Sequence, residues 1–214
     1  MRLRRQVLLG DRETVGQLTV LADDPADVRQ HPASGDVRCH VLEAQPTVVD
    51  DTATLLSATD GLLMPHGVIS GFPATDLYDD RWVFLLAEDH PDVGERFTRE
   101  DLARLPWVTY QRTYDAPAVR QLGMLGVEPR VEVSFDSFQL LPPLVTGTRR
   151  IALTQARLAR MLTPIAAVRV VEPPYEAATL REALWWHPAH THDAAHIRLR
   201  ETAARVGGRP AGVL

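Results

Sequence analysis

The sequence predicts an α/β protein with mostly parallel sheets, divided into two lobes. Short apolar runs rich in β-branched residues alternate with segments of helical spacing, which is the pattern of a parallel sheet covered by helices. In two stretches, 76–86 and 171–186, a strand follows a loop or a double proline with no room for a helix. We therefore expect two crossing strands between two Rossmann-like lobes, one formed by residues 1–84 and 174–214 and the other by residues 85–173.

The predicted strands are bounded by turn-forming residues and are short enough for a buried sheet. Residues 67–80 contain glycine, proline and aspartate and are expected to form an irregular loop. The strands are predicted at 18–22, 37–43, 60–65, 81–88, 107–111, 130–135, 150–154, 168–173 and 180–187.

Several predicted helices carry a start signal. Thr98 is followed three positions later by Asp101, the spacing of a capping box. Asp115 and Asp193 each precede a run of helical spacing and are expected to be N-caps. The amphipathic segment 135–148 contains two consecutive prolines, so we expect its helix to be kinked or broken there.

Composition excludes several classes of protein. The formal net charge of −5 gives no overall positive field to hold a phosphate backbone, so the chain by itself is expected to bind DNA poorly. The single cysteine, Cys39, excludes an internal disulfide and fits a reducing cytoplasm. The apolar run near the N-terminus is too short for a signal peptide, and no stretch approaches the length of a membrane span. We expect a cytoplasmic protein that does not enter a membrane.

Four motifs in chain order resemble the effector-binding domain of LysR-type transcriptional regulators, in particular its NodD-like branch. The most specific are "FQLLPPLVTGTRRIA" (138–152) and the Trp-Pro-His stretch that leads into the last helix; the others are "LYDDRWVFLLAEDHP" (77–91) and "TREDLARLPWVTY" (98–110). The resemblance covers about residues 37–206. It implies a fold like that of type 2 periplasmic binding proteins, with a small effector held in a cleft between two lobes. Effector binding would shift the population of lobe arrangements and thereby control DNA-binding heads.

The sequence departs from this family in two respects. No segment of it resembles the family's winged helix-turn-helix, so DNA is expected as a partner only through a head absent from this sequence. In addition, only residues 23–36 separate the first two predicted strands, less than the full helix expected there. That helix helps to pair two regulatory domains in the family, so the expected homo-oligomer is in question. One alternative is a headless homologue that pairs with full-length regulators and inhibits them.

A second alternative is a metal-dependent enzyme. The segment "WWHPAHTHDAAH" (185–196) holds four histidines, His187, His190, His192 and His196. His192 and His196 have the i, i+4 spacing of zinc ligands, but Asp193 between them is expected to start a helix, which leaves His192 outside it. The competing interpretation is a polar loop that caps the last helix.

Other catalytic signatures are absent from the sequence. It contains no G-x-S-x-G elbow, no G-x-x-x-x-G-K-[ST] loop and no G-x-G-x-x-G before a helix. Paired acids such as Asp79 with Asp80 are typical of turns and helix starts. We therefore expect a binding protein rather than an enzyme, with no cofactor and no metal.

Ligands of parallel α/β lobes lie beyond the carboxyl ends of the strands. Each candidate there also has a structural interpretation: Ser137 as a helix cap, Asp23 as a turn residue, Met64 as core. Together the candidates offer hydroxyl, amide and aromatic groups with little formal charge, which suits a mainly apolar, aromatic or phenolic effector. The predicted contacts are Asp23, Gln45, Met64 and His66 in the first lobe, and Tyr110, Gln111, Phe135, Ser137, Thr154 and Gln155 in the second.

Overall fold

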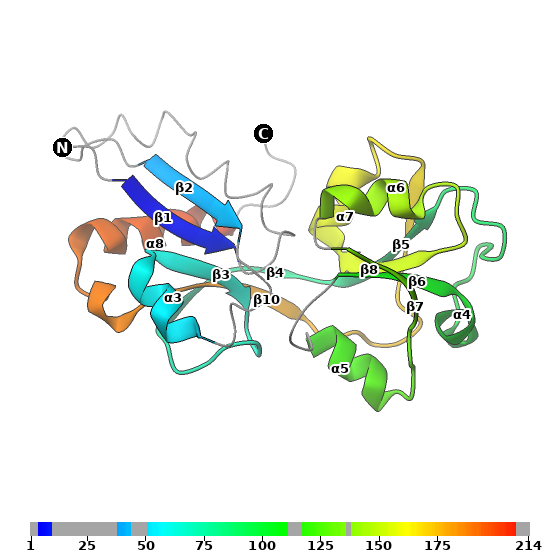
Figure 1. Cartoon of the computed structure of the whole chain (residues 1–214), viewed down its shortest axis with the longest axis horizontal. Coiled ribbons are helices and arrows are strands. Elements are labelled where there is room, and N and C mark those ends of the chain that lie inside the picture. The colour runs from blue at the N-terminus through cyan, green and yellow to red at the C-terminus, as the bar shows by residue number, and fades with distance from the viewer. Residues whose placement is uncertain (1–3, 10–37, 44–50, 111–116, 136–137, 209–214) are drawn as a thin grey trace. The chain divides into compact units, whose positions relative to one another are not determined.

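The structure, a computed structural model, describes residues 4–9, 38–43, 51–110, 117–135 and 138–208 (Figure 1). The chain divides into two compact units. The first unit consists of Met1–Asp79 and Arg181–Leu214, and the second of Asp80–Leu180. The chain thus passes between the units after Asp79 and after Leu180, whereas the sequence analysis placed these changes at 84/85 and 173/174.

The sheet of the first unit mixes parallel and antiparallel neighbours. Strands β1, β2 and β3 run parallel, with β1 in the middle. Strand β10 joins β3 in the antiparallel direction and separates it from β4. In the order in which they lie in the sheet, the strands are β2 (Arg38–Glu43), β1 (Arg4–Leu9), β3 (Gly61–Pro65), β10 (Leu180–Trp185) and β4 (Ala74–Asp80).

Two strands of this sheet correct the sequence analysis. Strand β4 occupies residues 74–80, which we expected to be loop; it is an edge strand in which only Leu77 and Tyr78 are buried, so its apolar signal is weak. Strand β1 was not predicted, and the strand predicted at 18–22 lies outside the described residues. Residues 10–37 connect the first two described strands. The expected shortened connection depended on a strand at 18–22, which lies outside the described residues, so it stays a prediction.

Helices of the first unit are α3 (Thr52–Ala58) and α8 (Ala194–Gly207), with a short 3-10 turn, η4 (Pro188–His190). The carboxylate of Asp193 accepts hydrogen bonds from the backbone N–H groups of Ala195 and His196, which confirms it as the N-cap of α8. Leu199 and Ala203 of α8 pack against the sheet in a buried cluster with Leu63 and Leu184. Helix α8 therefore covers the strands on which the unit's core depends.

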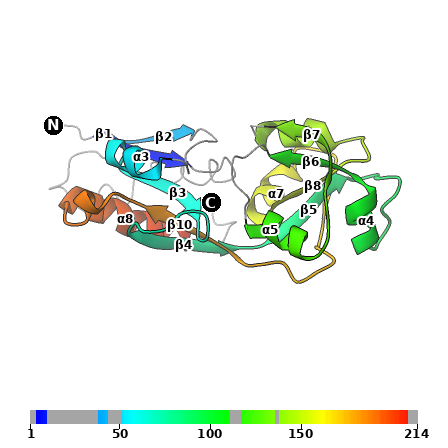
Figure 2. The same ribbon diagram turned by 60° about the horizontal axis from the view of Figure 1, so that its bottom comes forward.

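The second unit has its own five-stranded sheet (Figure 2). Strand β6 runs parallel to β7 and β8, while β5 runs antiparallel to β8 and β9. In sheet order the strands are β7 (Arg130–Phe135), β6 (Pro106–Tyr110), β8 (Ile151–Gln155), β5 (Trp82–Ala87) and β9 (Val168–Val171).

One helix of this unit begins at a start signal that the sequence predicts. Thr98 and Asp101 form the predicted capping box of α4 (Arg99–Arg104). The segment with the double proline is broken as predicted, into a 3-10 turn, η3 (Phe138–Leu140), and a short helix, α6 (Leu141–Val145). The remaining helices are α5 (Pro117–Met124) and α7 (Ala156–Leu162), and Asp115 lies outside the described residues.

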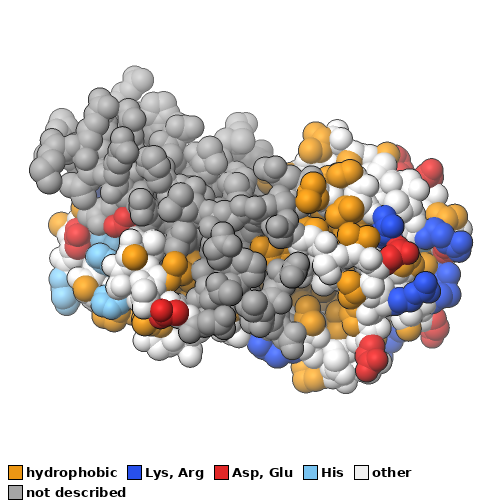
Figure 3. All heavy atoms as spheres, viewed as in Figure 1, with side chains coloured by type: hydrophobic (Ala, Val, Ile, Leu, Met, Phe, Trp, Pro, Cys, Tyr) orange, Lys and Arg blue, Asp and Glu red, His pale blue; other side chains and the backbone are white. Residues whose placement is uncertain are grey.

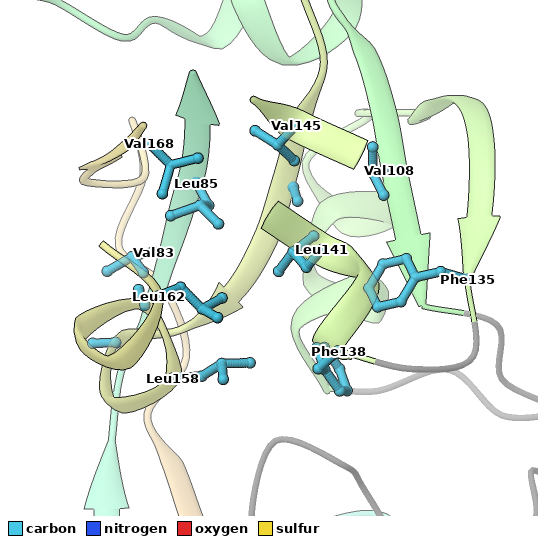
Figure 4. Close-up of a cluster of buried hydrophobic side chains, with 13 residues drawn as sticks. Val83, Leu85, Val108, Phe135, Phe138, Leu141, Val145, Leu158, Leu162 and Val168 are labelled. Carbon is cyan, nitrogen blue, oxygen red and sulfur yellow. The ribbon is translucent and has the colours of Figure 1, made fainter. Parts of the chain in front are cut away.

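Strand β5 of the second unit is buried on both of its faces. On one face, Val83 and Leu85 of β5 pack with Leu141 of α6 and with Leu158 of α7 (Figure 4). On the other face, Phe84 packs with Leu102 of α4 and Leu122 of α5. Neighbouring residues of β5 thus face opposite helix layers, which explains why the strand reads as a continuous apolar run.

Candidate functional site

Three parallel strands of the second unit end at the same edge of its sheet. Tyr110 and Phe135 are paired across the ends of β6 and β7, and Gln155 is the last residue of β8. Because β6 is parallel to both β7 and β8, these residues lie at one carboxyl edge. This is the position that the sequence analysis chose for an effector, and we call it the carboxyl edge of the second unit.

Three aromatic rings meet at this edge. The ring of Tyr110 is stacked on that of Phe138, with centroids 4.7 Å apart and planes 6° apart. Phe135 stands edge-on to both, at 5.6 Å from Tyr110 and 5.3 Å from Phe138. Phe135 and Phe138 are buried, whereas Tyr110 is only partly buried. Tyr110 is thus the accessible member of a rigid aromatic surface, and Phe138 is a member that sequence reasoning missed.

Buried polar atoms lie on β6 and β8, two of the strands that end at this edge. The side chain of Thr154 is 0% exposed and that of Gln155 is 1% exposed, yet Thr154 Oγ1 and Gln155 Nε2 have no hydrogen-bond partner among the described residues. The same holds for Thr109 Oγ1 on β6. A buried polar atom without a partner costs about 1–3 kcal/mol, so such atoms point to a bound molecule or water.

The polar atoms face both sides of the sheet. Thr154 pairs across the strands with Val83, whose side chain belongs to the core that also contains Phe135 and Phe138. Gln155 pairs with Trp82, which packs on the opposite side with Ala118 of α5. Strand alternation therefore places Thr154 on the aromatic side and Gln155 on the side of α5.

Charged groups at the β5 end of this edge have partners within the protein. Arg81 forms an ion pair with Glu172, which follows β9. The carboxylate of Asp80 accepts hydrogen bonds from the backbone N–H groups of Arg81 (2.8 Å) and Arg157 (3.2 Å). Burial nevertheless raises the pKa of Asp80 above its ordinary value, and the two hydrogen bonds only partly oppose this effect. The edge thus offers aromatic and neutral polar groups rather than free charge.

In the first unit, His66 directly follows the carboxyl end of β3 and is exposed. Its Nε2 lies 2.7 Å from Asp76 Oδ1, and its ring stands edge-on to Trp185 at 5.1 Å. Met64, two residues earlier, is fully buried among the core residues of β3. The other four predicted contacts, Asp23, Gln45, Gln111 and Ser137, lie outside the described residues.

The histidine-rich segment is held by contacts within the first unit. His187 caps the 3-10 turn η4 by accepting a hydrogen bond from the backbone N–H of Ala189. Buried His196 binds the Asp60 carbonyl through Nε2 and Arg200 through Nδ1 (2.9 Å), and His190 stacks on its ring at 5.1 Å. In the part of the chain that the structure describes, no group of three or more His, Cys, Asp or Glu residues could hold a metal ion.

Hydrophobic side chains are visible on both units in Figure 3, but the large ones that are most exposed among the described residues belong to the second unit. They lie at the end of α5, on the edge strand β7, in η3 and at the end of α7: Met124, Leu125, Val131, Leu140, Met161 and Ile165. No helix in the described ranges is long and apolar enough to span a membrane.

Comparison with known proteins identifies relatives of this chain. It matches the family described as the LysR substrate binding domain over residues 60–207. It is 30% identical to Nodulation protein D 2 of Rhizobium tropici over 159 residues, which is 72% of this chain and 51% of that protein. Nodulation protein D 1 of Mesorhizobium japonicum is 29% identical over 75% of this chain and 53% of its own length. The chain thus spans about half the length of the curated relatives it matches.

Solved structures share the fold. The regulatory domain of MexT, a transcriptional activator in Pseudomonas aeruginosa, matches with a TM-score of 0.74 at 18% identity, over 95% of this chain and all (100%) of that chain. The effector-binding domain of QuiR in complex with shikimate matches with a TM-score of 0.75 at 14% identity, over 97% and 98% of the two chains. The fold is therefore the periplasmic-binding-protein-like α/β fold of these regulatory domains. Since the family match extends over most of the chain, the protein belongs to the LysR substrate-binding domain family.

Proposed function

We propose that this chain is the effector-sensing domain of a LysR-type transcriptional regulator and that it binds a small, mainly apolar aromatic molecule. The observation that carries this proposal is the combination, at the carboxyl edge of the second unit, of a stacked aromatic surface with buried polar atoms that lack partners among the described residues. An aromatic ligand would pack against Tyr110, and one of its hydroxyl or carbonyl groups would satisfy Thr154 on the same face of the sheet. Gln155, at the end of β8 on the face of α5, would bind a polar group that extends past the edge.

The proposed role is binding without chemistry. A ligand stabilises the conformers that it binds best. The resulting change in conformer populations alters how the DNA-binding part of the regulator is arranged. DNA contact, oligomerisation and a cytoplasmic location belong to this proposal as properties of the whole regulator. The similarity to the nodulation D proteins and the shikimate complex of QuiR, which has the same fold, support a small organic ligand.

A ligand screen with matched variants tests the proposal. The change in melting temperature is measured with a library of phenols and a library of small aliphatic carboxylic acids, on the unmodified chain and on Tyr110→Leu, Thr154→Val and Gln155→Leu. Thr163→Val, at the end of α7 and away from the edge, is the control for the loss of a threonine hydroxyl.

We expect phenols to raise the melting temperature of the unmodified chain and of the control, and to do so much less for the three edge variants. Equally strong binding by all variants would show that the ligand does not bind at the carboxyl edge of the second unit. Stabilisation by aliphatic acids alone would contradict the aromatic class.

A further inference from the structure

A fourth strand of the second unit ends at the carboxyl edge. Strands β8 and β9 flank β5 and both run antiparallel to it, so β9 runs in the same direction as β8. Val171 ends β9, and Tyr175 follows it within the same unit. Tyr175 packs against the buried cluster that contains Phe84 and Leu122 of α5. It therefore lies beyond the carboxyl end of β9, on the sheet face that α5 covers.

Tyr175 shares this face with Gln155, the last residue of β8. Leu153, two positions before Gln155 on the same face, packs against the same cluster as Tyr175. Ala177, two positions after Tyr175, packs with Trp82, which is the strand partner of Gln155. The segment that carries Tyr175 thus passes beside the residues that surround Gln155, and both side chains belong to the second unit alone.

Hydrogen bonds on both sides of Tyr175 hold its backbone in place. On one side, Arg99 Nε donates to the carbonyl of Pro174 at 3.4 Å. On the other side, Gln121 of α5 donates to the carbonyl of Glu176 at 2.7 Å and accepts from the backbone N–H of Ala178 at 2.8 Å. A side chain on a segment fixed in this way is positioned well enough to select a ligand group.

Tyr175 and Gln155 present two buried donors without acceptors. Tyr175 Oη and Gln155 Nε2 are both buried and have no hydrogen-bond partner among the described residues, and the whole Gln155 side chain is 1% exposed. The amide nitrogen can only donate. Burial raises the pKa of Tyr175 to about 12, so its hydroxyl keeps the hydrogen at neutral pH. Buried donors of this kind point to a bound acceptor.

A neutral carbonyl oxygen matches these donors. It carries two lone pairs and can accept from both groups at once. An ionised carboxylate could accept as well, but removing its charge from water would cost far more beside groups that are themselves neutral.

We propose that Tyr175 and Gln155 form a carbonyl-binding subsite under α5, in which both donate hydrogen bonds to one carbonyl oxygen of the effector. This makes Tyr175 a specificity residue for aromatic ligands that carry a ketone. The inference rests on the proposed function, because it presumes that an aromatic molecule binds at the carboxyl edge of the second unit. A ligand with a methylene group in place of the carbonyl would leave both buried donors without a partner.

The first experiment compares p-hydroxyacetophenone with 4-ethylphenol, which has a methylene group in place of the carbonyl. Dissociation constants come from NMR titration of the full chain. We expect the ketone to bind about tenfold more tightly. Tyr175→Phe and Gln155→Leu should each reduce this preference to about threefold, the loss of one hydrogen bond. Tyr78→Phe removes a tyrosine hydroxyl from the buried cluster of the first unit and should keep the full preference.

The second experiment observes the hydrogen bond itself. The ¹³C resonance of a labelled carbonyl in p-hydroxyacetophenone moves downfield when its oxygen accepts hydrogen bonds. We expect the resonance of the bound probe to lie further downfield in the unmodified chain than in Tyr175→Phe. A merely structural role of Tyr175 would change the affinity for both probes without this difference, so identical bound positions would overturn the inference.

The outcomes separate this inference from the proposed function. Equal binding of both probes, or a full preference that survives in Tyr175→Phe, overturns the carbonyl subsite and leaves an aromatic-binding domain. Failure of both probes to bind counts against the aromatic ligand class and removes the inference with it. A preference lost in Tyr78→Phe as strongly as in Tyr175→Phe would assign the effect to a general change in the fold and would also overturn the subsite.

Discussion

Arg181 binds Asp79 through two hydrogen bonds, from Nε to Oδ1 at 2.7 Å and from Nη2 to Oδ2 at 3.4 Å. Asp79 is the last residue of the first unit before the chain enters the second, and Arg181 is the first residue after it returns. The pair therefore joins β4 and β10 where both strands leave the first unit. A fork of two parallel hydrogen bonds fixes geometry better than a single contact does.

The hydrogen bond from Arg181 lowers the pKa of Asp79 below its ordinary value. Arg181→Ala should therefore raise the pKa of Asp79, as measured by ¹³C NMR titration of the side-chain carboxyl. Because the folded-state value is the lowered one, the pair contributes stability at pH values above about 4 and loses that contribution as the pH falls through the lowered pKa.

A matched control exists in the second unit, where Arg149 lowers the pKa of Asp92 in the same manner. Arg149→Ala should raise the pKa of Asp92 and leave that of Asp79 unchanged. An Asp79 titration that is identical with and without Arg181 would contradict the observed pair.

Gln121 of α5 attaches the segment before β10 to the second unit. Its Nε2 donates to the carbonyl of Glu176 at 2.7 Å, and its Oε1 accepts from the backbone N–H of Ala178 at 2.8 Å. Gln121→Ala should lower the free energy of unfolding by about 1–2 kcal/mol, since it removes two hydrogen bonds and leaves a partly buried N–H without this acceptor.

Hydrogen exchange measures the local effect, and the amide of Ala178 should exchange faster in Gln121→Ala. Gln121→Glu retains the acceptor for Ala178 but loses the donor to Glu176, so it should protect that amide and recover part of the stability. Equal exchange of Ala178 in both variants would argue against the attachment.

The stability of the first unit should depend on pH through His196. Burial lowers the pKa of His196, and the cation of Arg200 adds to this effect. The unfolded chain therefore takes up the proton first, so the free energy of unfolding should fall as the pH drops below about 6.5 and continue to fall until the lowered pKa is passed.

Urea denaturation between pH 8 and pH 5 tests this expectation. In His196→Gln, which keeps an amide in place of the imidazole but cannot titrate, the same curve should be flatter. His192→Gln, at an exposed position in the same segment, is the control and should retain the wild-type slope. A loss of stability in His196→Gln as steep as that in the control would assign the pH dependence to another group.

Thr154→Val should stabilise the protein while it weakens ligand binding. The hydroxyl of Thr154 is fully buried and has no hydrogen-bond partner among the described residues, so its replacement by a methyl group should raise the free energy of unfolding by up to about 1 kcal/mol. Thr163→Val should change the free energy of unfolding by less than about 0.5 kcal/mol. Destabilisation of Thr154→Val by more than about 1 kcal/mol would show that the hydroxyl has a partner in the free protein.

The elements with strong local signals could be predicted from sequence. The apolar strands predicted at 60–65, 130–135 and 150–154 are present as β3, β7 and β8, and the helix starts at Thr98 and Asp193 are confirmed. Strand β4 was missed because this edge strand buries few apolar side chains and lies among turn-forming residues. Its pairing with β10 depends on tertiary contacts that no local pattern encodes.

The residues of the candidate site could likewise be predicted only where a local sequence pattern marks them. Tyr110 and Phe135 were found because they end predicted parallel strands, and the structure brings their rings together. Phe138 was missed because its stacking on Tyr110 depends on the turn η3. Thr109 could have been identified from strand alternation alone as a polar residue on a predicted strand. Asp76 could not be found, since the segment that carries it was expected to be a loop.

The position of β10 between β3 and β4 determines the order in which the two units can be completed during synthesis. When Leu180 leaves the ribosome, the continuous stretch of the second unit is already present in full. The first sheet at that moment still lacks the strand that joins β3 to β4, and α8 has not yet been made. The nascent chain must therefore hold an incomplete first sheet until β10 has been translated, and a sheet not yet covered by α8 until Gly207 has followed.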